Sequence, residues 1–149
     1  MKEPIVFGKA EYWVDALTRS LGFLTRVIHI QIGDRIRANR SLVASPATLA
    51  FLHLVDANPG IRQVHAARIL LIHESNMAML VKNLVAEGLI ERREGTGKRS
   101  GLWIAAKGAD MVAQSAAADV ISREHAECLS DEEYQQLVAL LDRVYRASL

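Results

Sequence analysis

Hydrophobic residues recur at helical spacing through most of the chain. Between about Glu11 and Asn39 they lie three or four positions apart, which predicts one long helix with a single apolar face. The residues of this face are Trp13, Leu17, Leu21, Leu24, Ile28 and Ile32. Ser45-Pro46 puts a capping hydroxyl before a first-turn proline, so a second helix is predicted to begin there and to end at Asn58-Pro59-Gly60.

Two further helices and then two strands are predicted to follow. Residues 61–71 form a short helix, and residues 73–87 form another that Gly88 ends. The buried stripe of this fourth helix is Met77, Leu80, Val81 and Leu84. The apolar period then changes: residues 89–93 and 102–104 are short strand candidates joined by a polar, glycine-containing turn. This pattern predicts a small hairpin.

The last part of the chain returns to a helical period. Alanine-rich residues from Lys107 to about Glu127 predict one helix, and Ser130 with Glu133 forms a capping box for a final one. The apolar stripe of that final helix is Leu137, Leu140, Leu141 and Val144. The predicted fold class is therefore mainly α with a small β-hairpin.

A short helix, a tight turn, a second helix and a hairpin follow one another in the order of a winged helix-turn-helix. We assign residues 45–106 to this DNA-binding unit, and residues 1–40 and 107–149 to a helical dimerisation region. The second helix of such a unit fits the major groove, which is about 12 Å wide, and the hairpin tip can reach the adjacent minor groove.

Composition and charge agree with a DNA-binding protein of the cytoplasm. Half of the 149 residues are hydrophobic, no apolar run is long enough for a membrane span, and the N-terminus lacks a signal-peptide pattern. A single cysteine, Cys128, excludes an internal disulfide framework and is expected to be a packing residue. Residues 62–100 hold seven Lys or Arg against four acidic residues, whereas residues 101–149 hold four against eight. The winged segment is therefore the cationic part, as a phosphate backbone requires.

Catalytic and metal-binding motifs are incomplete in this sequence. The glycine-rich residues 95–100 lack the first glycine of a phosphate-binding loop, where Arg92 stands. His73-Glu74 has no second histidine of a zinc-protease motif, and His125-Ala126-Glu127 has no Pro-Cys-x-x-Cys after it. We therefore expect no enzyme activity, no metal and no cofactor.

Candidate DNA contacts lie on the fourth helix and around the hairpin turn. Asparagine can pair with adenine, serine can bind phosphate or a base, and lysine can bind guanine or phosphate. On the fourth helix the candidates outside the buried stripe are Ser75, Asn76, Met79, Lys82 and Asn83. Near the turn they are Arg92, Arg93, Lys98 and Arg99, which suit the minor groove and phosphates. The alternatives are an ordinary solvated helix face and a charged turn that serves solubility.

Three segments resemble the MarR family of bacterial regulators: ANPGIRQ (57–63), ESNMAMLVKNLVAEGLIERR (74–93) and LWIAAKG (102–108). Within the family they look most like the branch that senses aromatic acids or their coenzyme A thioesters. Ala105 and Leu71 depart from the threonine and the turn glycine that are usual in the family. The usual Asp-x-Arg of the wing is replaced by Thr96-Gly97-Lys98, so the sequence leaves open whether Lys98 or Arg99 enters the groove.

The resemblance implies a homodimeric repressor that binds a pseudo-palindromic operator and is released by a small ligand. The first and last helices would pair across a two-fold axis. The ligand would lie in a cleft between the long helices and the winged domain. There Arg26 would bind a carboxylate, with His29, His53 and the apolar walls Phe23 and Phe51. A surface ion pair for Arg26, half-buried histidines, a regulator without an effector, and a protein-interaction module are the alternatives.

Overall fold

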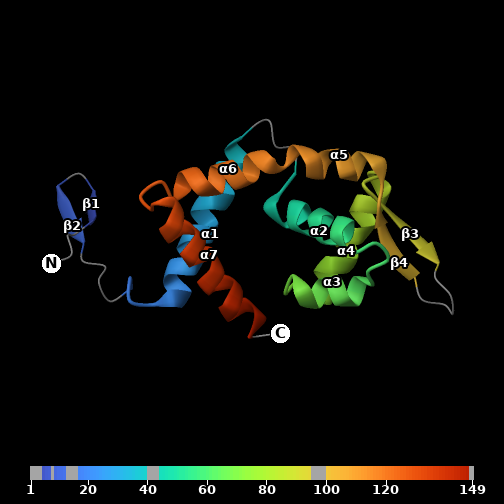
Figure 1. Ribbon diagram of the computed structural model, residues 1–149, viewed down its shortest axis with the longest axis horizontal. Coiled ribbons are helices and arrows are strands. Elements are labelled where there is room, and N and C mark those ends of the chain that lie inside the picture. Colours follow the sequence, from blue (N-terminus) through green and yellow to red (C-terminus); the bar gives the residue numbers. More distant parts are fainter. Residues whose placement is uncertain (1–4, 8, 13–16, 40–43, 95–99, 148–149) are drawn as a thin grey trace.

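The computed structural model describes residues 5–7, 9–12, 17–39, 44–94 and 100–147. One end of the molecule is a winged helix domain, and the other end gathers the first helix and the last two (Figure 1). The winged helix domain contains α2 (Pro46–Ala57), α3 (Gln63–Ile69), α4 (Glu74–Ala86), β3 (Ile90–Glu94) and β4 (Ser100–Ile104). The other elements are β1 (Ile5–Phe7), β2 (Ala10–Tyr12), α1 (Leu21–Ala38), α5 (Ala106–Gln114), α6 (Ala116–His125) and α7 (Asp131–Arg146). The predicted fold class, mainly helical with a small hairpin, is confirmed.

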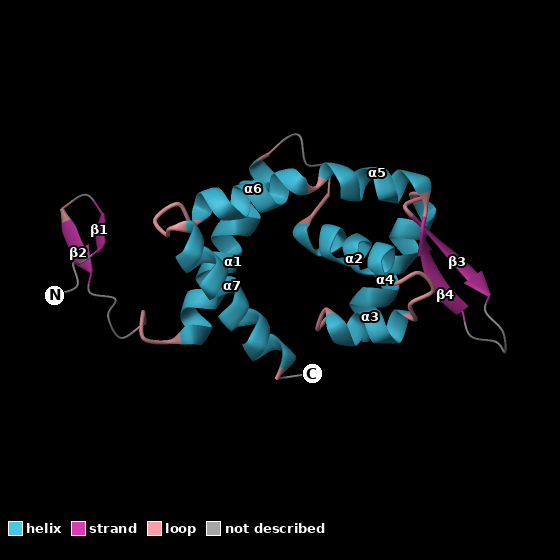
Figure 2. Ribbon diagram, in the orientation of Figure 1, coloured by secondary structure: helices cyan, strands magenta, loops and turns pink. Residues whose placement is uncertain are grey.

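The first helix begins later than predicted. It starts after Ser20, whose hydroxyl accepts a hydrogen bond from the Phe23 amide at 3.3 Å and so caps the helix. Glu11, where the helix was predicted to start, instead lies in β2 opposite Val6 of β1. Apolar spacing alone does not locate a helix start, because Leu17 keeps the period of α1 although it lies in a turn before the cap. Figure 2 shows the two described hairpins at opposite ends of the molecule.

The core of the winged helix domain lies between α2, α4 and the hairpin. Fully buried side chains of α2, such as Phe51 and Leu52, meet Met77 of α4 and Leu102 of β4. The strands β3 and β4 are antiparallel, with Ile90 opposite Ile104 at the base. A bridge between Ile61 and Leu102 ties the loop before α3 to the outer side of β4. The position of α3 relative to the hairpin is therefore set by backbone hydrogen bonds as well as by packing.

The turn between α3 and α4 contains an unusual residue. Leu71 has φ 52° and a side chain that is 72% exposed. The left-handed region costs an L-residue roughly 1–2 kcal/mol, and glycine avoids that cost. This geometry explains why a glycine is expected at the turn of a helix-turn-helix. In this chain a leucine takes the left-handed conformation that favours glycine.

The helix predicted over residues 107–127 is divided in two at Ser115. The Ser115 hydroxyl donates to the Val112 carbonyl at 2.7 Å and lies 2.7 Å from Nε2 of His53. Since the hydroxyl proton is already used, Nε2 of His53 must donate to Ser115. The chain passes at this residue from α5, which packs on α2, to α6, which packs on α1 (Figure 1).

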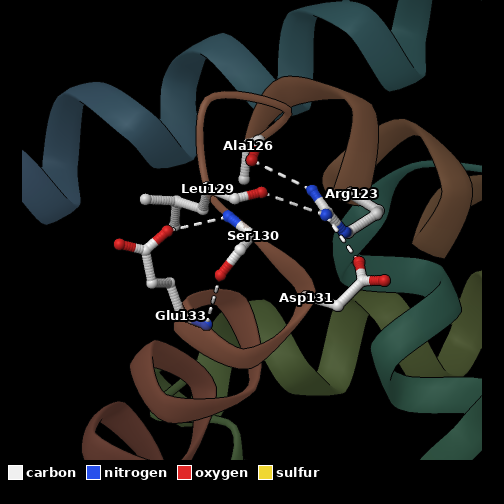
Figure 3. Close-up of polar contacts among 6 residues, drawn as sticks. All are labelled: Arg123, Ala126, Leu129, Ser130, Asp131 and Glu133. Carbon is white, nitrogen blue, oxygen red and sulfur yellow. Dashed lines mark hydrogen bonds and ion pairs between the residues drawn. The ribbon is translucent and has the colours of Figure 1, made fainter.

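The predicted capping box at the start of α7 is confirmed, and Arg123 organises the turn before it. Ser130 Oγ accepts from the Glu133 amide at 3.2 Å, and Glu133 accepts from the Ser130 amide at 2.8 Å (Figure 3). Arg123 donates to the carbonyls of Ala126 and Leu129 and to the Asp131 carboxylate, at 2.7–3.1 Å. These contacts set the direction in which α7 leaves α6. Within the described residues, no single helix is both long and apolar enough to cross a membrane.

Candidate nucleic-acid interface

The outer face of α4 is polar and open. Met77, Val81 and Leu84 turn into the core, and the positions opposite to them are exposed. The structure brings Ser75, Met79 and Lys82 together on this outer face, because they follow one another at helical spacing. Asn76 and Asn83, seven positions apart, are also exposed and lie on its flank. All five predicted contacts on this helix are therefore accessible.

Ser75 is held at the first turn of α4. Its hydroxyl lies 3.1 Å from Nδ1 of His73, the residue that precedes the helix. Both side chains are exposed. The N-terminal residues of a recognition helix are those that contact base edges in a major groove, and the positive end of the helix dipole favours phosphate there. Ser75 and His73 thus form a polar pair at the end of the helix where an anionic backbone is favoured.

The wing separates its two arginines onto opposite faces. Arg92 lies on the face that carries Ile90, and its Nη2 donates to Oε1 of Gln63 on α3 at 2.8 Å. Arg93 lies on the other face, where Nε and Nη2 both donate to Glu91, at 3.0 and 2.8 Å. Its guanidinium also lies over the Trp103 ring, 5.4 Å from the centroid. The charge of Arg93 is therefore paired within the wing, whereas that of Arg92 has a neutral acceptor. The remaining predicted wing contacts, Lys98 and Arg99, lie outside the described residues.

Sequence reasoning missed a row of basic side chains along α3. Arg62, His65 and Arg68 are spaced three apart, and all three are exposed. Arg62 and Nε2 of His65 are hydrogen-bonded to each other. Since arginine can only donate, His65 is the acceptor in this contact. The three-residue spacing of these basic side chains was visible in the sequence. Because α3 is short, that spacing alone did not distinguish a DNA-binding face from an ordinary solvated helix face.

A cleft of about 450 Å³ opens between the two ends of the molecule. Ile30, Gly33 and Arg37 line it from α1, and Leu70 and Ile72 line it from the helix-turn-helix turn. The start of α2 closes it with Ser45, Pro46, Ala47 and Ala50. Tyr145 of α7 donates to the Ile69 carbonyl at 2.7 Å, beside this turn. The cleft has the size of a small-molecule site and offers an apolar wall with a cationic group at one side.

Of the predicted ligand residues, only His29 is among the residues that line this cleft. Arg26 is exposed one helical turn before Ile30 on the same face of α1. Phe23 is half-buried on α1. His53 is hydrogen-bonded to Ser115.

Phe51 was predicted to form a wall of the cleft, and the structure shows that this prediction is wrong. Its side chain is 0% exposed because α2 turns it into the core of the winged helix domain. Sequence reasoning also missed Arg37, which lines the cleft and pairs with Asp34. Its place on the same face as Arg26, eleven residues later, was the available signal. In the part of the chain that the structure describes, no three His, Cys, Asp or Glu side chains form a metal-binding group.

A short helix, a turn, an exposed second helix and a β-hairpin define this chain as a winged helix-turn-helix protein. Residues 45–100 match the model of the MarR family. These residues span α2, α3, α4 and β3 and reach the start of β4, so the part of the chain that matches the family is its winged helix domain. No curated protein sequence matches the chain.

Solved structures of transcription regulators share the fold. The transcriptional repressor CouR, bound to a 23-mer DNA duplex, has a TM-score of 0.79 and 22% identity, over 91% of this chain and 99% of that one. The PcaV regulator of Streptomyces coelicolor, in complex with its natural ligand, has a TM-score of 0.76 and 20% identity, over 89% of this chain and 96% of that one. A MarR family protein of Mycobacterium tuberculosis, in complex with p-aminosalicylic acid, has a TM-score of 0.68 and 16% identity, over 84% of this chain and 98% of that one. At these identities the likeness is one of fold.

Proposed function

We propose that this protein is a transcriptional repressor that binds a pseudo-palindromic DNA operator as a homodimer and is released by a small aromatic acid or its coenzyme A thioester. The observation that carries DNA binding is the exposed face of α4 with Ser75, Met79 and Lys82, beside the uncompensated charge of Arg92. The repressor CouR has this fold and was solved on a DNA duplex, which supports the same use here.

The homodimer is supported by the apolar surface of the helical end. None of the sixteen residues of α7, all of which the structure describes, is buried, yet its apolar residues lie on one side. The exposed residues of this side are Leu137, Val138, Leu140, Leu141 and Val144. On α1, Leu21 and Ile28 are exposed as well. A second copy of the chain would cover both apolar surfaces. It would also place the two α4 helices of the dimer at a spacing that matches two DNA half-sites one helical turn apart.

Replacing Lys82 with alanine tests DNA binding. On a 30-base-pair duplex of mixed sequence at low salt, we expect about tenfold weaker binding, because each protomer loses one cationic contact. The slope of log affinity against log salt should fall by about 2, one for each protomer. Arg143→Ala, on the polar side of α7, is the matched control and should leave both values unchanged. Fluorescence anisotropy measures them. A wild-type protein that does not bind duplex DNA at low salt would instead be a protein-interaction module.

The proposed effector site is the cleft between α1 and α2. An aromatic ring would lie against Ile30, Leu70 and Ile72, and its carboxylate would meet Arg37, with His29 beside it. Arg26, one helical turn before Ile30, would be more distant from the ligand. The Asp34 partner of Arg37 is 65% exposed, and such surface ion pairs are weak enough for a ligand carboxylate to replace. The M. tuberculosis relative in complex with p-aminosalicylic acid supports an aromatic acid. A ligand releases DNA only as far as it prefers the DNA-incompetent arrangement.

Salicylate and benzoyl-coenzyme A are suitable probes of this site. We expect salicylate to raise the melting temperature, and Arg37→Met to weaken its binding about tenfold, because a charge-assisted hydrogen bond is lost. Arg26→Met should have a smaller effect, since Arg37 lines the cleft and Arg26 is not among its lining residues. Salicylamide, which has no carboxylate, is the matched control ligand. Isothermal calorimetry measures the affinities. If neither probe binds the wild-type protein, the regulator has no effector of this class.

A further inference from the structure

Gln63 lies between α4 and the hairpin of β3 and β4, which forms the wing. It is the first residue of α3, and its half-buried side chain borders a small hollow with Val64, Ala67, Glu74 and Met77. Its Oε1 accepts from Nη2 of Arg92 at 2.8 Å, across 29 positions of sequence. The hydroxyl of Ser100, on the opposite strand, lies 3.5 Å from Nη1 of the same arginine. One neutral side chain thus holds the wing arginine beside the start of α4.

The backbone fixes the two partners relative to each other. Arg92 lies opposite Leu102 in the hairpin, and Leu102 is bridged on its other side to Ile61, two residues before Gln63. The Leu102 carbonyl accepts from the Gly60 amide at 2.8 Å, and the Leu102 amide donates to the Ile61 carbonyl at 3.0 Å. Gln63 and Arg92 are therefore carried by neighbouring, hydrogen-bonded segments of one rigid frame. Their side-chain contact does not depend on the outer part of the wing.

The chemistry of the acceptor distinguishes Arg92 from Arg93. The Glu91 carboxylate neutralises Arg93, whereas an amide oxygen orients a guanidinium without removing its charge. A guanidinium has five N–H donors, so donors remain free to meet a phosphate when one of them binds Gln63. An arginine that is already ordered loses less conformational freedom on binding than a free one.

We infer that Gln63 is a positioning residue that holds Arg92, with its full charge, toward a DNA phosphate. The inference rests on the proposed function, because it assigns a role within DNA binding. It also predicts the effect of the two closest substitutions: methionine removes the acceptor at similar size, and glutamate keeps the acceptor but compensates the charge.

The test measures binding of a mixed-sequence 30-base-pair duplex by Gln63→Met and Gln63→Glu, each made alone and together with Arg92→Ala. We expect Gln63→Met to weaken binding about three- to tenfold with an unchanged salt slope, since a hydrogen bond to the contacting arginine is lost. Gln63→Glu should weaken binding further and lower the slope, because Arg92 no longer counts as a free cation. In the Arg92→Ala background, Gln63→Met should have no effect, and Gln63→Glu should keep only the general repulsion of an added carboxylate. Gln135→Met, on an exposed position of α7, is the control.

The outcomes are distinct. If Gln63→Met weakens binding equally with and without Arg92, Gln63 acts by itself or through stability, and the inference is wrong. The inference also fails if wild type binds the duplex and Gln63→Met binds it as tightly; the proposed function then stands. If wild type does not bind duplex DNA at all, both fail together. Thermal melting of each variant identifies a loss that comes from unfolding, and Gln63→Glu provides a second variant with the native side-chain shape.

Discussion

Glutamate at both Leu137 and Leu141 is expected to convert the protein to a monomer and to weaken its DNA binding at least about a hundredfold. Both leucines lie on the exposed apolar side of α7, 40% and 39% exposed in a single chain. Burying two carboxylates against a second copy would cost more than the apolar contact supplies. Once the protomers separate, each half-site is bound alone and the gain from linking two sites is lost, which is about 10²–10⁴ in affinity.

Sedimentation velocity gives the oligomeric state, and anisotropy on a 30-base-pair duplex gives the affinity. The matched control is Gln135→Glu with Ala139→Glu, which adds the same charge at the same spacing on the polar side of α7. This control should remain a dimer and bind DNA with at most a small loss. A Leu137→Glu, Leu141→Glu protein that still sediments as a dimer would show that α7 does not form the interface.

Replacing Gly108 with alanine is expected to destabilise the winged helix domain by about 3 kcal/mol, the upper part of the range for overpacking. The new Cβ would lie 2.1 Å from the Leu89 carbonyl oxygen and 3.0 Å from Cγ1 of Ile104. Neither neighbour can move easily. That carbonyl accepts from the Ala105 amide at 3.0 Å, and Leu89 is only 1% exposed at the junction of α4 and β3. The close approach of α5 to this junction therefore requires a glycine.

Urea unfolding followed by circular dichroism measures the change. Gly22→Ala is the matched control, because Gly22 is exposed within α1 and a Cβ there meets nothing closer than Ser20 Oγ at 3.9 Å. It should stabilise the protein by about 1 kcal/mol through helix propensity. Equal free energies of unfolding for Gly108→Ala and wild type would show that α5 can shift without disturbing the domain.

The winged helix domain could be predicted from the sequence because its signals are local. Ser45-Pro46 gave the start of α2 and the stripe around Met77 gave the inward face of α4, since caps and helical periods are encoded within a few residues. The break at Ser115 could not be predicted in this way. It depends on a hydrogen bond from His53, 62 positions earlier, and alanine-rich sequence on both sides favours a continuous helix.

The same distinction applies to the site. The accessible face of α4 follows from its period, and all five of its candidate residues are exposed. Arg92 and Arg93 are adjacent residues of the same type, and their different partners, Gln63 and Glu91, show which of the two charges is compensated. In the cleft, apolar type suggested a wall at Phe51, but the inward face of α2 takes that residue into the core. Sequence patterns could not assign the side chains whose role depends on a partner brought close by the fold, such as Arg92 with Gln63, 29 positions away.

Ser115 is the junction at which the chain passes from the winged helix domain to the helical end. Of the two covalent connections between the helical end and the winged helix domain, this one is a single residue long, between Gln114 and Ala116. The hydrogen bond from His53 ties Ser115 to α2, while α5 packs on α2 and α6 packs on α1. In the proposed homodimer, a change in the backbone torsions of Ser115 would therefore alter the distance between the two α4 helices.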